Sequence, residues 1–520
     1  MSTGPASQTQ TPSLDENRAM AILFTAAAIL TGLRLLALFS TPLELYPDEA
    51  QYWLWSRALH WGYVSKPPLI AWLIWLTTRA GGDGEPWVRL SAPLVHAGAM
   101  LALYPVGRRL YGPAVGLLGA LLYGLMPAVQ ISALFIATDA PLMLFLALAL
   151  WAYVALLQEA APGRRRGLAA AAGAALGLAF LAKYAAAFLL IGAFAHAALD
   201  RGARRAWRGG AWAIALAALL LILGPNLAWL AGHRFATVAH TAQVNAHWSP
   251  ATLFNPGKLL EFELDQLGIV GPVPLGALLI GGIVLARRKA LEPADRMLLC
   301  FILPPLVLVS VQALISRAHA HWAATAYLAG VVLAAAWLIR WRARGWIIAT
   351  FALQGAVAAL LLAVLAWPQI ADQTGNGRRL ARVRGWATTA SLVASAARAQ
   401  APSGGVSAVA VEDRYMFNAV AYYGRGYFGR PGAAPLKMRP AAKALNEAEL
   451  SDPLTPGDAR RVLIAESVGL PPVPALPGDF ARLTPAGHWV IPLGGGKTRE
   501  ILLAVGEGYR GGISGRSTPP

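Results

Sequence analysis

Long apolar runs separated by short polar segments dominate the chain up to about residue 367. A helix needs about 20 apolar residues to cross a bilayer. Runs of this kind lie at 20–40, 90–107, 113–131, 140–158, 210–232, 266–286, 297–316, 322–340 and 345–367. A further run, 167–199, would form a helix about 50 Å long, well beyond a hydrocarbon core of about 30 Å. We expect it to fold back as two helices with Lys183 and Tyr184 at the turn, which gives an α-helical polytopic membrane protein with about 11 transmembrane helices.

Composition divides the chain into three parts. Residues 1–19 are polar and rich in Pro, Ser and Gln, which predicts a disordered cytoplasmic tail. Residues 20–367 form the predicted transmembrane domain, in which 41–89 is the first outer loop. Within that loop the apolar stretch Leu69 to Thr78 is too short to span and is expected to be re-entrant or interfacial. Residues 368–520 predict a small soluble α/β domain, because the apolar runs stop there.

Hydrophobic periodicity predicts alternating helices and strands in this C-terminal part. Helices are expected at Arg379 to Ala399 and at Asp413 to Tyr423, the second opened by its acidic first residue. The residues after Tyr509 are expected to be frayed. Strands are expected at Val406 to Val411, Arg461 to Glu466, His488 to Leu493 and Glu500 to Val505.

Composition supports a membrane protein and excludes other classes. Of the 520 residues, 57% are hydrophobic and 13% are charged, whereas about 25% of the residues of soluble domains are charged. The net charge of +18 does not indicate nucleic-acid binding, because the basic residues gather in short loops between apolar runs. The only cysteine, Cys300, excludes a disulfide framework and a thiol metal cluster.

The basic loops also predict the orientation of the chain in the membrane. Loops rich in arginine and lysine are expected in the cytoplasm. Alternate loops carry such clusters, at 108–109, 164–166, 201–208, 287–289 and 340–344. The remaining loops, and everything after residue 367, would then face outward. Every polar group with obvious chemical potential falls on that outer side.

One stretch of the first outer loop, Leu45 to Pro68, combines two acids, aromatic residues and a lysine. Pro47 suits the first turn of a helix, so Asp48 and Glu49 would lie where the helix dipole favours negative charge. Tyr52 would share a helix face with Asp48. Tyr63 and Lys66 follow, and Lys66 is held in an extended conformation because a proline comes next. The alternative is an acidic helix start, an interfacial aromatic belt and a lysine that reaches toward water.

Three further groups of residues lie at the outer ends of predicted spans. Asp139 is either the N-cap of the following helix or a site residue. Lys183, with Tyr184 beside it, is costly within an apolar run unless it reaches water or a partner. Arg317, His319 and His321 form either an interfacial anchor or a cationic cup for an anion such as phosphate. We predict no metal ligands and no firm cofactor, and a divalent metal stays an alternative with weak support, since His319 and His321 lack a third well-placed ligand.

Acids and cations gathered on the outer face suit transfer of a sugar from an anionic lipid-linked donor. Such a reaction needs a cation for the departing phosphate and a base for the incoming hydroxyl group. The sequence contains no Walker loop, dinucleotide-binding fingerprint or nucleophile elbow that would indicate another common chemistry.

The motifs that carry these residues resemble those of the GT-C glycosyltransferases. They are Pro47-Asp-Glu-Ala-x-Tyr52, Lys66-Pro-Pro68, Thr138-Asp-x-Pro-Leu142, Lys183-Tyr184 and Arg317-x-His-x-x-Trp322. The chain is most similar to the bacterial family-39/83 type, which includes protein-mannosyltransferase-like, aminoarabinose-transferase-like and Rgt-type galacturonosyltransferase enzymes. The resemblance covers about residues 40–370.

The resemblance implies both a site and a function. Asp48 would be the essential carboxylate and candidate base, with Glu49 and Asp139 as further catalytic candidates. Lys66 would contact the lipid phosphate. Ser65 stands where aminoarabinose transferases carry a glutamate, which argues against carrying over their metal site and their sugar. Tyr52, Tyr63, Lys183, Tyr184, Arg317, His319 and His321 complete the predicted substrate-binding set.

We therefore predict a bacterial inner-membrane glycosyltransferase with its active site and C-terminal domain on the periplasmic side. Its donor would be a polyprenyl-phosphate sugar, and its acceptor a lipopolysaccharide-type glycolipid, another glycan or a protein. Its partners would be membrane lipid and these substrates, with no nucleic acid. The alternative is a transporter or flippase of lipid-linked sugars, which also carries intramembrane charges. A flippase would need them in both leaflets or in paired broken helices.

Overall fold

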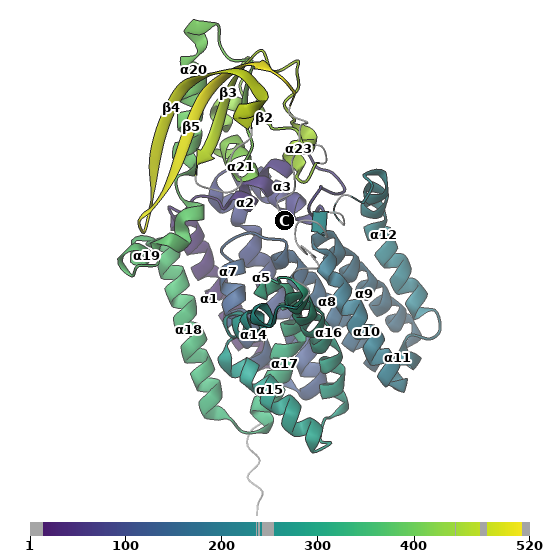
Figure 1. The fold of residues 1–520 in the computed structure, drawn as a ribbon. Coiled ribbons are helices and arrows are strands. Elements are labelled where there is room, and N and C mark those ends of the chain that lie inside the picture. The colour runs from purple at the N-terminus through teal and green to yellow at the C-terminus, as the bar shows by residue number, and fades with distance from the viewer. Residues whose placement is uncertain are drawn as a thin grey trace, which may run out of the picture.

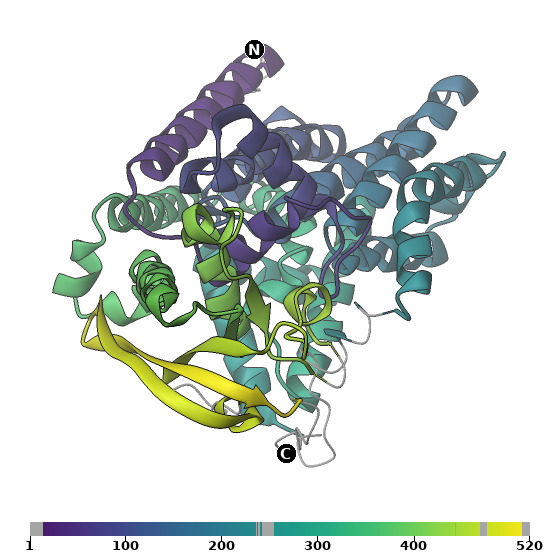
Figure 2. The ribbon, with the colours of Figure 1, turned by 90° about the horizontal axis from the view of Figure 1, so that it is seen from above.

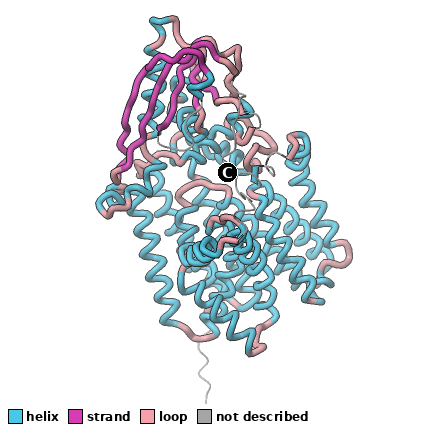
Figure 3. The backbone as a smooth tube through the Cα atoms, in the orientation of Figure 1, coloured by secondary structure: helices cyan, strands magenta, loops and turns pink. Residues whose placement is uncertain are grey.

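The computed structural model consists of a helical bundle with an α/β domain on one end (Figures 1 and 3). It describes residues 14–235, 237, 240–241, 254–441, 444–468 and 476–511. Most of the predicted tail, residues 1–13, therefore lies outside the described residues, as do residues 512–520 of the predicted frayed end. The last residues of that tail are not disordered, because the first helix already begins at Glu16.

Seven helices of the described residues are long and apolar enough to cross a membrane. Adding one span for a bent helix pair and three shorter apolar helices gives the predicted number of about 11. The long helices are α1 (Glu16–Ser40), α5 (Ser91–Tyr111, extended by α4, Glu85–Arg89), α8 (Asp139–Gln158), α9 (Pro162–Ala182), α12 (Ala211–Gly232), α16 (Pro293–Ile315) and α18 (Arg344–Ala366). The shorter ones are α6 (Pro113–Leu125), α10 (Ala187–Leu199) and α17 (Ala326–Arg340).

The apolar run 167–199 folds back as predicted. Helix α9 ends at Ala182, and Lys183 is extended, with φ −162° and ψ 138°. A short 3-10 turn, η1 (Tyr184–Ala186), then leads into α10. Lys183 thus stands at the break between two helices that each fit the apolar layer.

The apolar run at 266–286, predicted to be long enough to span the membrane, is not one continuous helix. The run is divided between α14 (Pro256–Val270) and α15 (Pro272–Arg287), which meet at an angle of 117°. Gly271 lies between them with φ +92°, a conformation that favours glycine, and Pro272 cannot donate a backbone hydrogen bond. The run 113–131 is also divided, at Met126, and the next helix, α7 (Pro127–Ser132), again begins with a proline.

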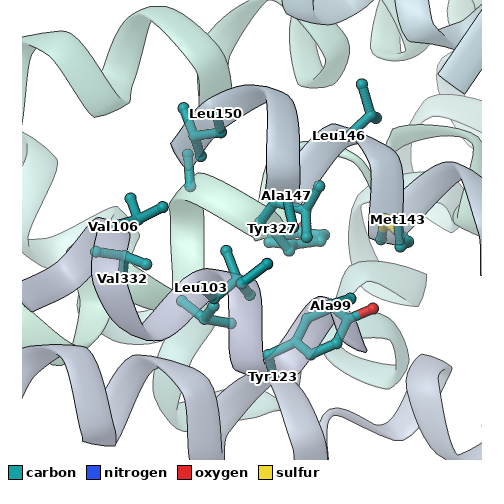
Figure 4. Close-up of a cluster of buried hydrophobic side chains, with 14 of the residues drawn as sticks. Ala99, Leu103, Val106, Tyr123, Met143, Leu146, Ala147, Leu150, Tyr327 and Val332 are labelled. Atoms are coloured by element: carbon teal, nitrogen blue, oxygen red, sulfur yellow. The ribbon is translucent and has the colours of Figure 1, made fainter. Parts of the chain in front are cut away.

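The core of the bundle is formed where α5, α6, α8 and α17 meet (Figure 4). Leu103, Leu146 and Val332 are among its fully buried side chains. Gly107 on α5 and Gly116 on α6 let these two helices approach closely. A Cβ atom added to Gly107 would lie only 2.8 Å from the Cα of Gly116. Small residues at helix crossings are a general solution for packing in membranes, where lipid supplies little hydrophobic drive.

The bundle has one basic end and one end that carries the candidate residues. At the basic end, Arg108 pairs with Glu16, and Arg340 pairs with Asp295. At the opposite end, the chain between α1 and α5 forms α2 (Pro47–Trp55) and α3 (Leu69–Gly81). Helix α2 begins at Pro47 as predicted, and α3 has only 13 residues, in keeping with an interfacial segment.

The C-terminal domain contains a mixed five-stranded sheet of order β2-β1-β3-β5-β4. Strand β1 pairs in parallel with β2 and β3, and β5 is antiparallel to both β3 and β4. The strands are β1 (Ala408–Val411), β2 (Leu436–Met438), β3 (Arg461–Val468), β4 (Phe480–Gly494) and β5 (Lys497–Tyr509). The predicted small α/β domain and its four predicted strands are therefore present.

The helices of this domain agree only partly with the sequence pattern. Helix α21 (Arg414–Tyr423) follows Asp413, whose side chain caps it by accepting a hydrogen bond from the Tyr415 N–H. The predicted helix at 379–399 is wrong at its start, since η5 (Gly377–Val383) comes first and α20 (Trp386–Ala399) begins only after Gly385. Gly385 has φ +76°, which interrupts the helix. Shorter elements are α11 (Arg201–Ala206), η4 (Ala320–Ala323), α19 (Gln369–Gln373), η6 (Ala401–Ser403), α22 (Arg425–Phe428), α23 (Glu447–Ser451) and η7 (Leu476–Asp479).

The C-terminal domain contacts the chain between α1 and α5. The Glu44 carboxylate accepts hydrogen bonds from the first N–H groups of α20, those of Trp386 and Ala387. The Tyr423 hydroxyl accepts a hydrogen bond from the Leu45 N–H at 2.7 Å, and the ring of Tyr422 packs edge-on against Trp53. Figure 2 shows that the domain covers only part of this end of the bundle.

A buried acid makes the stability of this domain pH-dependent. Glu466 on β3 is 5% exposed, and one of its carboxylate oxygens has no hydrogen-bond partner in the described structure. Burial, followed by the nearby Glu412 and Asp413, raises the pKa of Glu466 to about 8, and Arg439 opposes the shift. The folded domain therefore holds a proton that the unfolded chain releases above its ordinary pKa of 4.5.

We expect protonated Glu466 to contribute on the order of a few kcal/mol to the free energy of unfolding. This contribution is fully present below pH 4.5 and is lost as the pH rises to about 8. Amide hydrogen exchange in β3, corrected for the intrinsic exchange rate, should show protection that falls between pH 5 and pH 8. Glu466→Gln keeps the shape and removes the titration, so its protection should stay constant. An equal fall in the variant would contradict the assignment.

Candidate active site

The two neighbouring acids at the start of α2 have different environments. Glu49 is buried, and its carboxylate accepts hydrogen bonds from the buried Arg89, with the shortest contact 2.8 Å. It also accepts the N–H groups of Tyr46 at 2.8 Å and Ile136 at 2.9 Å. Glu49 is thus fully engaged within the protein.

Asp48, by contrast, faces outward from the same turn, and its side chain is 38% exposed. Its nearest cation is Arg414, the first residue of α21 in the C-terminal domain, with Nη1 at 3.5 Å from Oδ1. The carboxylate of Asp48 is therefore accessible and only loosely paired.

Lys66 lies in the loop between α2 and α3, and contacts from three segments hold this loop. The Tyr63 N–H donates to the Lys66 carbonyl at 3.0 Å, and the Thr237 hydroxyl donates to the Tyr63 carbonyl at 2.9 Å. From the C-terminal domain, the Glu447 carboxylate accepts the Val64 N–H at 2.8 Å. The backbone at Lys66 is thus supported by the bundle and by the C-terminal domain.

The ammonium group of Lys66 forms no ion pair with the residues that the structure describes. Burial, followed by the charge of Lys183, lowers its pKa; Asp139 and Asp48 act in the opposite direction, and Arg414 also lowers it. Lys66 therefore interacts electrostatically with these four groups. It is a desolvated cation, which favours contact with an anion.

Asp139 and Lys183 form an ion pair across the helices. The Lys183 Nζ lies 2.8 Å and 3.0 Å from the two carboxylate oxygens of Asp139. Both side chains keep partial exposure, 18% for Lys183 and 22% for Asp139. The alternative of Asp139 as an N-cap is wrong, because α8 starts at Asp139 itself, after Thr138.

Arg317, His319 and His321 lie on the segment between α16 and α17. Burial lowers the pKa of His321 to about 4; Asp139 opposes this shift, whereas Lys183, His319 and Lys66 add to it. His321 is thus neutral at physiological pH and close to the Asp139–Lys183 pair. Its ring lies 5.8 Å from that of His319. No group of three His, Cys, Asp or Glu side chains in the described structure could hold a metal ion.

The three predicted tyrosines serve different contacts. Tyr52 is buried and packs against Trp55; burial, then the charges of Asp48 and Asp139, raise its pKa, so it lies next to both acids. The Tyr63 hydroxyl donates to backbone carbonyls of the same loop. The Tyr184 hydroxyl donates to Asn226 at 3.0 Å, and Asn226 in turn donates to the Trp61 carbonyl.

Most of the predicted residues therefore come together at one end of the bundle. Asp48, Lys66, Asp139, Lys183 and His321 are linked by direct contacts or by their mutual charges. Tyr63 and Tyr184 support the surrounding loops, and Glu49 anchors α2. The sequence pattern did not reveal Arg89 and Arg414, since neither lies in a conspicuous motif and each reaches its acid only through folding.

Comparison with protein families and curated proteins gives two matches in sequence. Residues 65–229 match the family profile described as dolichyl-phosphate-mannose-protein mannosyltransferase, a range that includes Lys66, Asp139 and Lys183. The chain is 40% identical over 298 residues to the lipid A galacturonosyltransferase RgtD of Rhizobium johnstonii. That match covers 57% of this chain and 61% of the relative, which is less than two thirds of its length.

Two solved structures share the fold over almost the whole chain. The ArnT protein from Cupriavidus metallidurans in the apo state is 18% identical and has a TM-score of 0.62, over 94% of this chain and 98% of that one. The same protein bound to undecaprenyl phosphate is 17% identical with a TM-score of 0.63, over 96% and 100% of the two chains. The predicted resemblance to the GT-C glycosyltransferases is therefore confirmed, in sequence by one family profile and one relative, and in fold by two structures of one protein.

Proposed function

We propose that the protein transfers a sugar from a polyprenyl-phosphate donor to a lipid acceptor of the lipid A type. The observation that carries the proposal is the meeting of Asp48, Lys66 and the Asp139–Lys183 pair at one end of a membrane bundle. The activity named for the galacturonosyltransferase relative supports a uronic acid as the sugar. The undecaprenyl phosphate bound by the structural relative supports a polyprenyl carrier.

Asp48 is the proposed base because its carboxylate is the least engaged of the three candidates. Asp139 has both oxygens on Lys183, and Glu49 is surrounded by Arg89 and backbone N–H groups. Among the described residues, the Asp48 carboxylate has a single side-chain contact, at 3.5 Å to Arg414, and its side chain is 38% exposed. An acceptor hydroxyl group can therefore reach it and transfer a proton to it.

The reaction is a single displacement at the anomeric carbon. The acceptor oxygen forms a bond to this carbon while the bond to the phosphate oxygen breaks, through an oxocarbenium-like transition state. The hydroxyl proton passes to Asp48, and the polyprenyl phosphate leaves with the bonding electrons. Lys66, a desolvated cation, stabilises the charge that develops on the phosphate. Inversion at the anomeric carbon follows from the single step.

The other predicted site residues assist this centre. Asp139 fixes Lys183, and the pair keeps a second ammonium group near the phosphate. Glu49, predicted as catalytic, is proposed here as a positioning residue. His321 and Tyr52 lie close to the acids. These two residues, Arg317 and His319 are proposed to contact donor or acceptor.

The transporter alternative receives no support from the comparisons, whose relatives are named as transferases or bind a lipid carrier. The protein is a multi-pass membrane protein of a bacterial inner-membrane type. We propose that the end with Asp48 and the C-terminal domain faces the periplasm, since the basic loops lie at the opposite end.

Substitutions at the two adjacent acids should separate catalysis from folding. Asp48→Asn keeps volume and removes the base, so we expect folded protein that has lost transfer in liposomes supplied with lipid-linked sugar. Glu49→Gln leaves Arg89 buried without its counter-charge, which costs about 3–5 kcal/mol and should lower the yield and the thermal midpoint. Near-normal activity of purified Asp48→Asn would contradict the role of the base.

Replacement of Lys66 should weaken the use of the donor. Loss of a charge-assisted contact to phosphate costs about 1.5–3 kcal/mol, or roughly one to two orders of magnitude in kcat/KM. We expect this loss for Lys66→Ala and partial recovery for Lys66→Arg, measured with a polyprenyl-phosphate sugar. Transfer from a nucleotide sugar alone, without a lipid-linked intermediate, would overturn the donor assignment.

Reporter fusions test the orientation. An alkaline phosphatase fused after residue 400 should be active if the C-terminal domain is periplasmic, and one in the loop at 201–208 should be silent. The reverse pattern would contradict the periplasmic site.

A further inference from the structure

The C-terminal domain contributes a guanidinium group to the candidate site. Arg414 opens α21 and lies beside Asp48, with a side chain that is 35% exposed. Its Nη1 donates to Gln51 at 3.3 Å and lies 3.5 Å from Asp48, and its Nη2 donates to Tyr415 at 2.9 Å. The Nε–H and one Nη2–H have no acceptor among the described residues. The Arg414 guanidinium group thus lies beside the carboxylate proposed as the base, and two of its N–H groups have no acceptor among the described residues.

The position of this fork is fixed by its own helix. The guanidinium carbon lies 4.4 Å from the centre of the Tyr415 ring, a stacked arrangement. Asp413 caps the same turn through the Tyr415 N–H. A planar fork that is held in place in this way is suited to bidentate recognition of a carboxylate or phosphate.

The charges around Asp48 leave room for a second anion. Four cations lie near the two acids Asp48 and Asp139, and these cations are Lys66, Lys183, Arg382 and Arg414. His321 adds no charge at neutral pH. One negative charge of the donor phosphodiester would balance only one of the two surplus cations. A sugar without an anionic group would leave one cation, counting the exposed Arg382, without a counter-charge.

Arg414 is the cation best placed for this second anion. Lys183 is paired with Asp139, and Lys66 is proposed for the phosphate. Arg382 is exposed and donates to the Tyr46 hydroxyl at 2.7 Å. Arg414 lies beside the base, where the reacting sugar must sit.

We propose that Arg414 binds the carboxylate of a uronic acid donor and thereby selects it over a neutral hexose. This inference rests on the proposed function, in which Asp48 acts on a lipid-linked sugar. The carboxylate of a uronate is attached to C5, next to the ring oxygen that is bonded to the anomeric carbon. A sugar with its anomeric carbon at Asp48 therefore brings its carboxylate within reach of the same end of the site.

The test compares donors that differ only in the carboxylate. Wild-type protein and Arg414→Gln are reconstituted in liposomes with lipid A and either polyprenyl-phosphate galacturonate or polyprenyl-phosphate galactose. We expect Arg414→Gln to lower kcat/KM for galacturonate, mainly through KM, about 10- to 100-fold more than it lowers kcat/KM for galactose. Arg414→Lys keeps the charge without the fork and should recover part of the loss.

A matched control comes from the same domain. Arg398 is exposed on α20 and lies over the Tyr427 ring at 5.4 Å, so Arg398→Gln removes a comparable arginine–tyrosine contact away from Asp48. It should leave both donors unaffected. The acceptor is varied as well, with lipid A and its dephosphorylated form, because a phosphate of the acceptor is the other source of an oxyanion.

The outcomes distinguish the two proposals. An equal loss with both donors in Arg414→Gln would overturn the carboxylate assignment and make Arg414 a positioning residue for Asp48. A loss that follows the acceptor phosphate would also overturn it. If wild-type protein transfers neither sugar from the lipid carrier, the proposed function fails, whereas a wild type active with galactose alone contradicts only the specificity for a uronate.

Discussion

The buried ion pair between Glu49 and Arg89 determines the geometry of the active-site end. Its carboxylate joins three segments that are distant in sequence: the start of α2, the short helix α4 and the segment before α8. Arg89 also donates to the carbonyls of Leu43 and Glu44. Because the pair is excluded from water, its hydrogen bonds must all be satisfied, and the surrounding backbone has little freedom to move. Asp48 and Asp139 each lie within three residues of a backbone group that this pair holds.

The same constraint explains how adjacent acids acquire different properties. Glu49 faces the protein and is neutralised by Arg89, whereas Asp48 is rotated by one helical position toward solvent and Arg414. One acid thereby stabilises the fold, and its neighbour remains accessible for proton transfer. Burial also affects Lys66, because it disfavours the charged ammonium group and lowers the pKa of Lys66. An anion that binds beside Lys66 would favour the charged form again.

The C-terminal domain is part of this arrangement and not a separate attachment. Its helix α20 is capped by Glu44 from the chain between α1 and α2, its Glu447 holds the Lys66 loop, and its Arg414 lies beside Asp48. Such contacts couple the stability of the domain to the shape of the site. A change in the packing of α21 would move a guanidinium group next to the proposed base.

The sequence by itself determined the class of fold, most of the spans and the α/β character of the C-terminal domain, and it singled out most of the residues that the structure brings together at one end of the bundle. The thickness of the bilayer sets the length of an apolar run that can span it, and arginine and lysine gather in the loops on one side. Because the run at 167–199 is too long for one span, Lys183 could be assigned to a turn before any contact was known. Local signals also sufficed for Pro47 at the start of α2 and Asp413 at the start of α21. Tertiary structure alone decided the bend at Gly271, the pairing of Asp139 with Lys183, the burial of Glu49 and the entry of Arg414 into the site. The charge contacts among these features join residues 40 to 366 positions apart, and a local pattern of hydrophobic and polar residues carries no information about which distant charge will balance a buried one.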